Sequence, residues 1–467
     1  MPVADVLSAV KDHIDRAGGY DLYRDYENGD HKYPYASDAY KKKFGWIVKQ
    51  ARLNACYTVR SNFTDLVQIQ SWSGAGADAA HTLAETTDLD MVFDLAINEA
   101  WRCGDAYILV WPGKDGKPRP WYHRADQAGF LVEPDDPSTM RVAWKIWVDV
   151  DGYGRVNLYS ATDVERWVTI AKVRQTGADG ATWDTAKNVE AWQPYTADGE
   201  PEVQAHPFGE VPWEHIPFDA QTQGGHGRSI LRDVIAPQDG LNHTVHALLS
   251  NTEWYGKVVA GLLNHQADVT IDPSTGTVRS ETVELDETRN SIFGIRGPGP
   301  LTQLTPPNSE NLLAVKRGWH TDIANTVGVP VSEVVPELGN IPSGAALRVL
   351  ASRRTATVRS FNKSVTGRIG RVMALLGVAD AYPKFADPAP VDETERIENA
   401  TAKRALGYPL EELLADLGED PDDIERILEA MGREEAAIGR AARTAYDQGR
   451  TGSTPATLPE AESLEAT

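Results

Sequence analysis

The residues with the best spacing for chemistry are one histidine pair and two carboxylate pairs. His243 and His246 stand three positions apart in a helical stretch, so both imidazoles could reach one metal ion. The sequence places no third ligand, and catalytic zinc needs three protein ligands. Two pairs of carboxylates could act as the acid and base of a glycosidase: Asp88 with Asp90, and Glu133 with Asp135. Because the chain has 68 acidic residues, such pairs also arise by chance. We therefore predict no catalytic residue, no metal and no cofactor.

Other motifs that carry chemistry are absent or incomplete in the sequence. There is no GxxxxGK[ST] phosphate loop, no GxGxxG, no GxSxG and no HExxH. Asp149 to Gly154 begins like a calcium loop, but Tyr153 stands where an oxygen ligand belongs and Ser160 replaces the bidentate glutamate, so we predict a hairpin turn. Cys56 and Cys103 are too few for a disulfide framework, and we expect two buried thiols.

The net charge of -22 argues against tight, static DNA binding, which needs a basic face. The charge is uneven along the chain: residues 308–386 carry 10 basic and 5 acidic residues, whereas 387–467 carry 8 basic and 20 acidic. An acidic body remains compatible with a duplex that passes without sticking, since like charges repel. Charge alone does not separate that function from a protein indifferent to nucleic acid.

Residues 1–225 have the pattern of a mixed helical and stranded domain. Residues 90–103 have amphipathic helical spacing, and residues 106–111, 142–150, 156–159 and 164–173 are aromatic and β-branched with turn residues between them, which predicts a meander of hairpins. Eleven of the 13 Trp precede residue 225. We interpret them as core packing of a thin sheet, with a sugar-stacking platform as the alternative.

Residues 226–343 predict two helices on either side of a small β module. The first helix spans 229–255, with Pro237 expected to end or kink it, and the second spans about 309–327. Between them, strands are predicted at 257–262, 268–271, 282–285 and 291–295. Residues 336–343 contain two prolines and no periodicity, so they predict a constrained loop.

A long helix is predicted from residue 343 to 376, where one apolar stripe is maintained over about 34 residues. It contains no acidic residue. Its basic residues are Arg348, Arg353, Arg354, Arg359, Lys363, Arg368 and Arg371. Three interpretations stay open for this run: a solvated face, a face for ion pairs between subunits, or contact with phosphates.

The C-terminal part is predicted to form short acidic helices at 392–406, 409–417 and 422–431, followed by a disordered tail at 451–467. The longest apolar run has about six residues, which is too short to span a bilayer. Charged residues interrupt the first twenty positions, so we expect no secretion signal.

The ordered series of these stretches resembles the portal proteins of tailed bacteriophages, especially those of phages that infect actinobacteria. The most specific stretches are Ile323 to Pro330 (IANTVGVP) and, after a short loop, Ser343 to Arg348, which opens the long helix. The supporting stretches are Arg52 to Leu66, Gly104 to Val110 with the Lys114 to Lys117 turn, Phe208 to Pro212, and Gly227 to Ser229. The resemblance covers nearly all of residues 1–445.

The resemblance implies a multidomain α+β fold with the parts of a portal. The implied parts are an α+β wing (1–225), a first stem helix region (226–256), a small β clip (257–304), a second stem helix (305–329), a tunnel loop (330–343), a long helix returning to the wing and crown (344–386), a helical acidic crown (387–450) and a disordered tail (451–467). The implied tunnel-loop residues are Glu337, Leu338, Gly339, Asn340, Ile341, Pro342 and Ser343. Lys316 and Arg317 are the candidate residues of the stem, and the basic helix would face neighbouring subunits or DNA.

The function that the resemblance implies is a structural channel rather than catalysis. Portals are closed rings, typically of twelve subunits, through which double-stranded DNA enters and leaves the capsid. The implied partners are further copies of the chain, the terminase large subunit, the head–tail connector, and the major capsid and scaffolding proteins, with no membrane. The implied location is the portal vertex of the virion, and the host cytoplasm during assembly. The alternatives from other classes are a Trp-rich carbohydrate-active hydrolase and a monomeric virion adaptor or scaffold.

Overall fold

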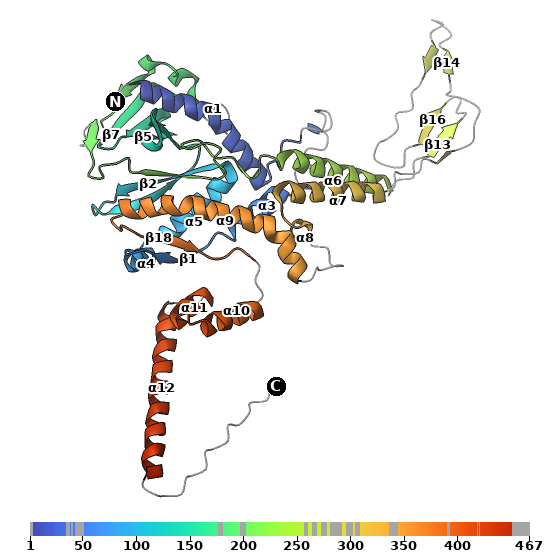
Figure 1. Cartoon of the computed structure of the whole chain (residues 1–467). Coiled ribbons are helices and arrows are strands. Elements are labelled where there is room, and N and C mark those ends of the chain that lie inside the picture. Colours follow the sequence, from blue (N-terminus) through green and yellow to red (C-terminus); the bar gives the residue numbers. More distant parts are fainter. Residues whose placement is uncertain are drawn as a thin grey trace. The chain divides into compact units, whose positions relative to one another are not determined.

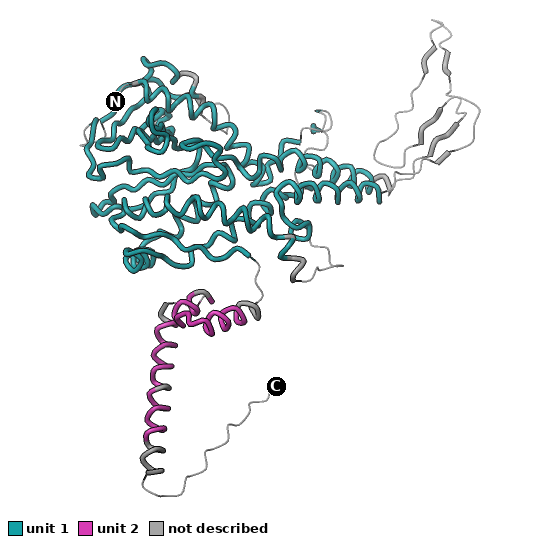
Figure 2. Tube along the Cα trace, in the orientation of Figure 1, with its two compact units in different colours: residues 1–389 teal, residues 390–467 magenta. Residues whose placement is uncertain are grey.

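The computed structural model describes most of the chain. The described residues are 3–33, 38, 41–42, 51–175, 181–196, 202–255, 260–263, 269–271, 278–280, 292–295, 302–303, 309–335, 344–389, 393–417, 419 and 421–450. The chain divides into two compact units, residues 1–389 and 390–467 (Figure 2). Helices and short antiparallel sheets alternate irregularly in the first unit, so the fold class is α+β, as predicted.

The elements of the first unit are shown in Figure 1. The helices are α1 (Val3–Asn28), α3 (Ala55–Thr64), α4 (Ala77–Thr86), α5 (Leu89–Cys103), α6 (Ile235–Tyr255), α7 (Ser309–Val327), α8 (Val331–Val334) and α9 (Gly344–Leu375). The strands up to residue 217 are β1 (Ile69–Ser73), β2 (Asp105–Pro112), β3 (Pro118–His123), β4 (Ala128–Glu133), β5 (Asp136–Val148), β6 (Tyr153–Tyr159), β7 (Asp163–Lys172), β8 (Arg174–Gln175), β9 (Ala181–Thr182), β10 (Trp192–Pro194), β11 (Val203–Ala205) and β12 (Trp213–Pro217). The later strands are β13 (Ala260–Leu263), β14 (Val269–Ile271), β15 (Val278–Ser280), β16 (Ile292–Ile295), β17 (Thr302–Gln303) and β18 (Tyr382–Phe385).

The predicted meander of hairpins is confirmed. Strands β4, β5, β6 and β7 pair antiparallel in chain order, and β10 and β11 extend β7. The turn between β5 and β6 holds the calcium-like stretch, where the Asp149 carboxylate accepts hydrogen bonds from the backbone N–H of Asp151 and Tyr153. A separate sheet has the strand order β12-β2-β3.

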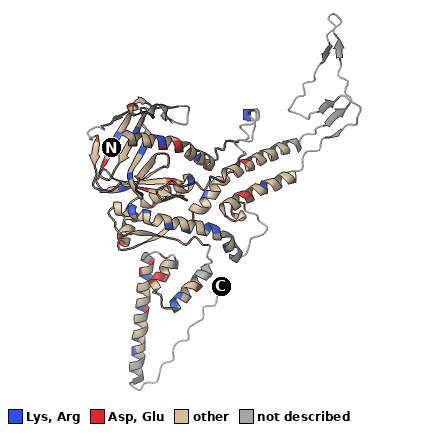
Figure 3. Ribbon diagram, turned by 45° about the horizontal axis from the view of Figure 1, so that its top comes forward, with Lys and Arg blue, Asp and Glu red and all other residues tan. Residues whose placement is uncertain are grey.

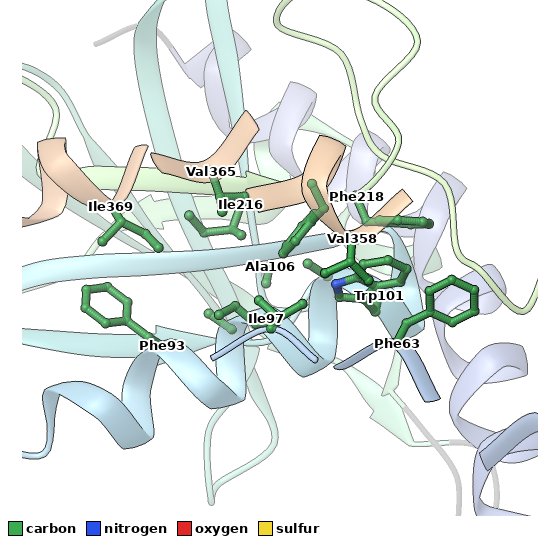
Figure 4. Packing of buried hydrophobic residues seen from close by; sticks show 14 of the residues in the cluster. Phe63, Phe93, Ile97, Trp101, Ala106, Ile216, Phe218, Val358, Val365 and Ile369 are labelled. Atoms are coloured by element: carbon green, nitrogen blue, oxygen red, sulfur yellow. The ribbon is translucent and has the colours of Figure 1, made fainter. Parts of the chain in front are cut away.

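The largest apolar core lies where α9 packs over β12 and β2, with α5 on the other side (Figure 4). The α9 stripe contributes Val358, Val365 and Ile369, all almost fully buried. Trp101 of α5 stacks against Phe218 at 4.0 Å between ring centroids. The apolar stripe predicted for the long helix therefore faces the core, as its 3.6-residue period requires.

A second core explains most of the tryptophans in the meander. Trp144, Trp167, Trp183 and Trp192 are buried together, under the apolar face that α1 presents near its N-terminus. No helix was predicted for residues 3–28, which contain Gly18 and Gly19, two residues of low helix propensity. Burial of Val6, Ala9 and Val10 against this sheet stabilises the N-terminal part of the helix.

The two helices predicted on either side of the β module are α6 and α7, which pack against each other (Figure 1). The bounds of α7 match the prediction, but α6 begins at Ile235 rather than at residue 229. Pro237 therefore lies in the first turn of α6 and does not end or kink the helix, because a first-turn residue has no intrahelical N–H partner to lose.

The described residues between α6 and α7 include five short strands. β13 pairs parallel to β16 and antiparallel to β17, and β14 pairs with β15. The predictions at 268–271 and 291–295 coincide with β14 and β16, whereas residues 282–285 lie outside the described residues.

The second unit contains α10 (Glu393–Ala405), α11 (Leu410–Leu417) and α12 (Pro421–Arg450). The third helix is 30 residues long, so the prediction that it ends near Met431 was wrong. The chain remains helical through Gly432. The tail 451–467 lies outside the described residues. None of the helices described for either unit has both the length and the apolar character needed to cross a membrane.

Candidate functional site

A buried carboxylate that was not predicted from the sequence holds α9 in place. Glu214 of β12 is 4% exposed, and its Oε1 accepts hydrogen bonds from Arg371 at 2.8 Å and Arg368 at 3.2 Å. Burial raises the pKa of Glu214, while the two arginines oppose that shift. Two of the predicted basic residues therefore hold the helix onto the sheet.

Three more of the basic residues also bond within the chain. Arg354 pairs with Glu333 of α8, Arg359 pairs with Asp387 at 2.8 Å, and Arg353 donates to the backbone carbonyl of Asn325 at 3.3 Å. Arg348 and Lys363 are exposed. Figure 3 shows the Lys and Arg residues spaced along this helix. The role of these side chains toward neighbouring subunits or DNA stays a prediction, and the structure adds intrachain partners for five of the seven.

The predicted tunnel loop, Glu337 to Ser343, lies outside the described residues. Its flanks are described. On one side Gly328 ends α7 with a φ of 76°, a backbone conformation that favours glycine, and the short helix α8 follows. On the other side α9 begins at Gly344.

The two candidate stem residues lie on α7, where Lys316 is half-buried and Arg317 is exposed. The contacts between α7 and α6 include polar ones. The Trp319 indole N–H donates to the Thr244 hydroxyl at 3.1 Å, and the Asn251 side chain donates to the Ser309 hydroxyl at 3.0 Å.

The base of α6 is fixed by two buried amides that the sequence analysis did not identify. Gln238 accepts a hydrogen bond from the backbone N–H of Ala55 and donates to the carbonyl of Leu53, both at 2.8 Å. Asn242 accepts from the backbone N–H of Leu53 at 2.9 Å. Polar residues on an otherwise apolar helical face were the only sequence signal for this anchor.

A buried network around Asp105 joins four segments of the chain. The fully buried Asp105 carboxylate accepts hydrogen bonds from the Tyr20 hydroxyl and the His215 ring, both at 2.6 Å, and from the backbone N–H of Gly227 at 2.8 Å. Burial alone would raise the pKa of Asp105, but hydrogen bonds from His215 and His226 hold it well below its usual value. Burial lowers the pKa of His215 to about 4.

Among the described residues, Asp105, His215 and His226 are also the one group with metal-ligand spacing, with donor atoms within 4.8 Å of one another. Their surroundings do not favour a cation. The Arg16 guanidinium lies 3.6 Å from the Asp105 carboxylate and 3.0 Å from Nδ1 of His226, so positive charge is already present. The arrangement fits a hydrogen-bonded network that ties α1 and β12 to the segment before α6. The predicted histidine pair, His243 and His246, is not part of this group.

A groove of about 670 Å³ runs between α9 and the segment from β12 to α6. Small and hydroxyl-bearing residues of α9 form one wall, and arginines from both sides line it. The residues are Ala356, Thr357, Ser360, Ser364, Arg228, Arg232, Arg353 and Arg368. Arg228 is paired with Asp219 at 2.6 Å. The groove is polar but holds no arrangement of nucleophile and base.

The structure gives no sugar-stacking platform on the described part of the meander. Of the meander tryptophans, Trp144, Trp167 and Trp192 are buried and Trp147 is half-buried, so they present no row of open ring faces. Of the two carboxylate pairs considered for hydrolysis, Asp88 and Asp90 lie exposed at the start of α5. Glu133 and Asp135 lie at the turn between β4 and β5, where Glu133 is half-buried and Asp135 is exposed.

Comparison with known proteins finds no matching family model and no matching curated protein. Solved structures with some similarity come from gene transfer agent particles. A chain of the native virion has 14% identity and a TM-score of 0.40, one of the native neck, computed with C12 symmetry, has 16% and 0.35, and one of the empty neck, computed with C6 symmetry, has 13% and 0.36. In each case 79% of this chain and 90% of the other are covered.

Proposed function

We propose that this chain is the subunit of a phage portal, a closed ring of typically twelve copies that forms a channel for double-stranded DNA at one capsid vertex. The proposal involves no covalent chemistry and no cofactor. It requires a head-to-tail contact between copies whose rotation closes, stiff helices around the channel, and a wall that does not trap phosphates.

The observation that carries the proposal is the order and pairing of the elements. An α+β body leads into α6, five short strands follow, α7 returns antiparallel along α6, and α9 then packs back onto β12 and β2 of the same body. A separate acidic helical unit comes last. A portal needs these parts in this order: wing, stem, clip, stem, long helix and crown.

The charge distribution supports passage rather than retention of DNA. The chain carries -22, and most of the basic residues on its most basic helix bond to side chains or carbonyls of the same chain. A basic side chain held in an ion pair contributes less to releasing counterions from DNA. On the described part of α9, at least five of the seven cations therefore already bond within the chain and would hold a moving duplex less strongly.

Each part of the proposed portal has an expected partner. The β strands between α6 and α7 would contact the terminase large subunit during packaging and the head–tail connector afterwards. The outer surface of the ring would contact the major capsid and scaffolding proteins. The protein would act in the virion, after assembly in the host cytoplasm.

Shortening residues 337–343 tests the function separately from the fold. We expect the shortened chain to form rings in normal yield but to fail to package or retain the genome in a complementation assay. A matched control shortens the turn at 150–152 between β5 and β6, where Val150 and Asp151 are exposed. Normal phage yield with the shortened loop would contradict the proposed channel.

A further inference from the structure

An exposed apolar groove of about 750 Å³ lies between α4, α5 and the β2–β3 hairpin, on the face of α5 opposite the main core. Met91 is 56% exposed, Leu95 is 44% exposed and Trp121 is 48% exposed. Met91 and Leu95 are one helical turn apart, and Trp121 of β3 lines the same groove. Aromatic and methionine side chains exposed together are typical of protein contacts rather than of a solvated surface.

The rim of this groove is acidic. Glu85, Asp88 and Asp115 line the groove, and Asp90 and Asp94 stand next to Met91 and Leu95 along α5, outside the lining. Burial and then repulsion from Asp90 raise the pKa of Asp94. Of the two cations in the groove, Arg119 is already paired with Asp115 at 3.0 Å. The groove therefore favours an occupant that is both apolar and basic.

One segment of the chain has that composition. Residues 43–50 read KFGWIVKQ and follow two further lysines, and they combine Phe44, Trp46, Ile47 and Val48 with positive charge and no acidic residue. These eight residues lie outside the described part of the structure.

Both ends of this segment are fixed at the base of α6. Before it, the Tyr33 ring lies 5.3 Å from that of His246 in α6. After it, Arg52 pairs with Asp30 at 3.0 Å, and the backbone N–H of Leu53 bonds to Asn242. The described residues on the two sides of this segment thus lie near the same part of α6.

We propose that residues 43–50 of one copy dock into the acidic groove of a second copy. The contact joins two different surfaces, the base of α6 on one copy and α5 with β3 on the other, so it is head-to-tail and can repeat around a ring. This rests on the proposed function and names the subunit contact that it requires. The apolar side chains would fill the space beside Met91, Leu95 and Trp121, and the lysines would neutralise the rim.

Disulfide trapping between two differently marked chains tests the contact. A Trp46→Cys chain is mixed with a Leu95→Cys chain under mild oxidation. The native thiols do not interfere, because Cys56 and Cys103 are buried and burial raises their pKa, that of Cys56 to about 12. We expect disulfide-linked pairs of the two chains in about tenfold higher yield than with Tyr57→Cys, an exposed control on α3 outside the groove, because the contact raises the local thiol concentration.

The other outcomes overturn the inference in distinguishable ways. Equal yields with Leu95→Cys and Tyr57→Cys would mean that the segment does not use this groove. A disulfide within one chain of the double variant, without linked pairs, would mean that the segment covers its own groove. Rings without the specific disulfide would leave the proposed function standing and reject this contact, whereas linked pairs without rings would reject the function and keep the contact.

A charge exchange gives an independent measurement. Changing Glu85 and Asp88 to Lys is expected to reduce assembly and the specific disulfide, and Lys43 and Lys49 changed to Glu should do the same. Combining both sets should restore them. Failure of the combined variant to recover, while circular dichroism shows each chain folded, would contradict the pairing of these charges.

Discussion

Glu214 shows how one residue sets the position of the basic helix. It is a buried carboxylate on β12, and Arg368 and Arg371 reach it from α9. We expect Glu214→Gln to lower the free energy of unfolding by about 2 kcal/mol, below the ~3–5 kcal/mol of a fully buried pair, because both arginines remain partly in water. Urea unfolding measures this, with Glu202→Gln, an exposed residue just before the short strand β11, as the control. A change in Glu214→Gln no larger than in the control would contradict the anchoring role.

His123 predicts a specific loss of stability in acid. Burial lowers its pKa to about 3, with Lys145 adding to the effect. The unfolded chain therefore binds a proton more readily than the folded chain below the ordinary pKa of about 6.5, and stability falls as the pH drops from there toward 3. We expect His123→Phe to remove about 2 kcal/mol of the loss between pH 6.5 and 4.5. Exposed His81→Phe is the control, and a pH dependence unchanged by His123→Phe would refute the assignment.

At the residue scale, the sequence identified the basic side chains of α9 but not their partners. Glu214 and Asp387 are distant from α9 along the chain, and Glu333 lies beyond the loop that precedes it, so the spacing within the helix could not indicate them. The Asp105 network was missed for the same reason, since its members come from four separate segments. Residue type predicts what a side chain can do, and the fold decides which group it meets.

At the scale of elements, Gly240 determines how closely α6 and α7 approach. A Cβ at Gly240 would lie 2.7 Å from the Trp319 ring, whereas a Cβ at Gly318 of α7 would meet nothing within 4 Å. We expect Gly240→Ala to destabilise the first unit by about 1–3 kcal/mol through overpacking. Gly318→Ala should be neutral or stabilising by up to about 1 kcal/mol, because alanine favours helix. Thermal unfolding measures both, and equal effects would contradict the close packing of the two helices.

Elements with a regular apolar period in their own sequence were predictable. Elements that depend on packing or pairing with distant segments were not. The stripes of α5, α7 and α9 gave their type and nearly their bounds. In α1 two consecutive glycines weaken the local signal, and packing against the meander compensates. Strand β1 pairs with β18, more than three hundred residues later, and no local pattern in residues 69–73 indicates that partner.

At the scale of the whole molecule, the proposed channel requires many copies of the chain to be arranged around one axis. The tunnel loop and most of the β module lie outside the described residues, so the channel itself stays a prediction from the order of the parts. The proposed docking of the basic segment 43–50 into the apolar, acidic groove on α5 is one specific contact between copies that can be tested.

The mass and projected shape of the purified protein test the central claim most directly. For twelve copies of 51.1 kDa, light scattering at micromolar concentration and moderate salt should give about 610 kDa, and negative-stain images should show rings with a central hole. A species of 51 kDa under these conditions, with no ring in the images, would contradict the account.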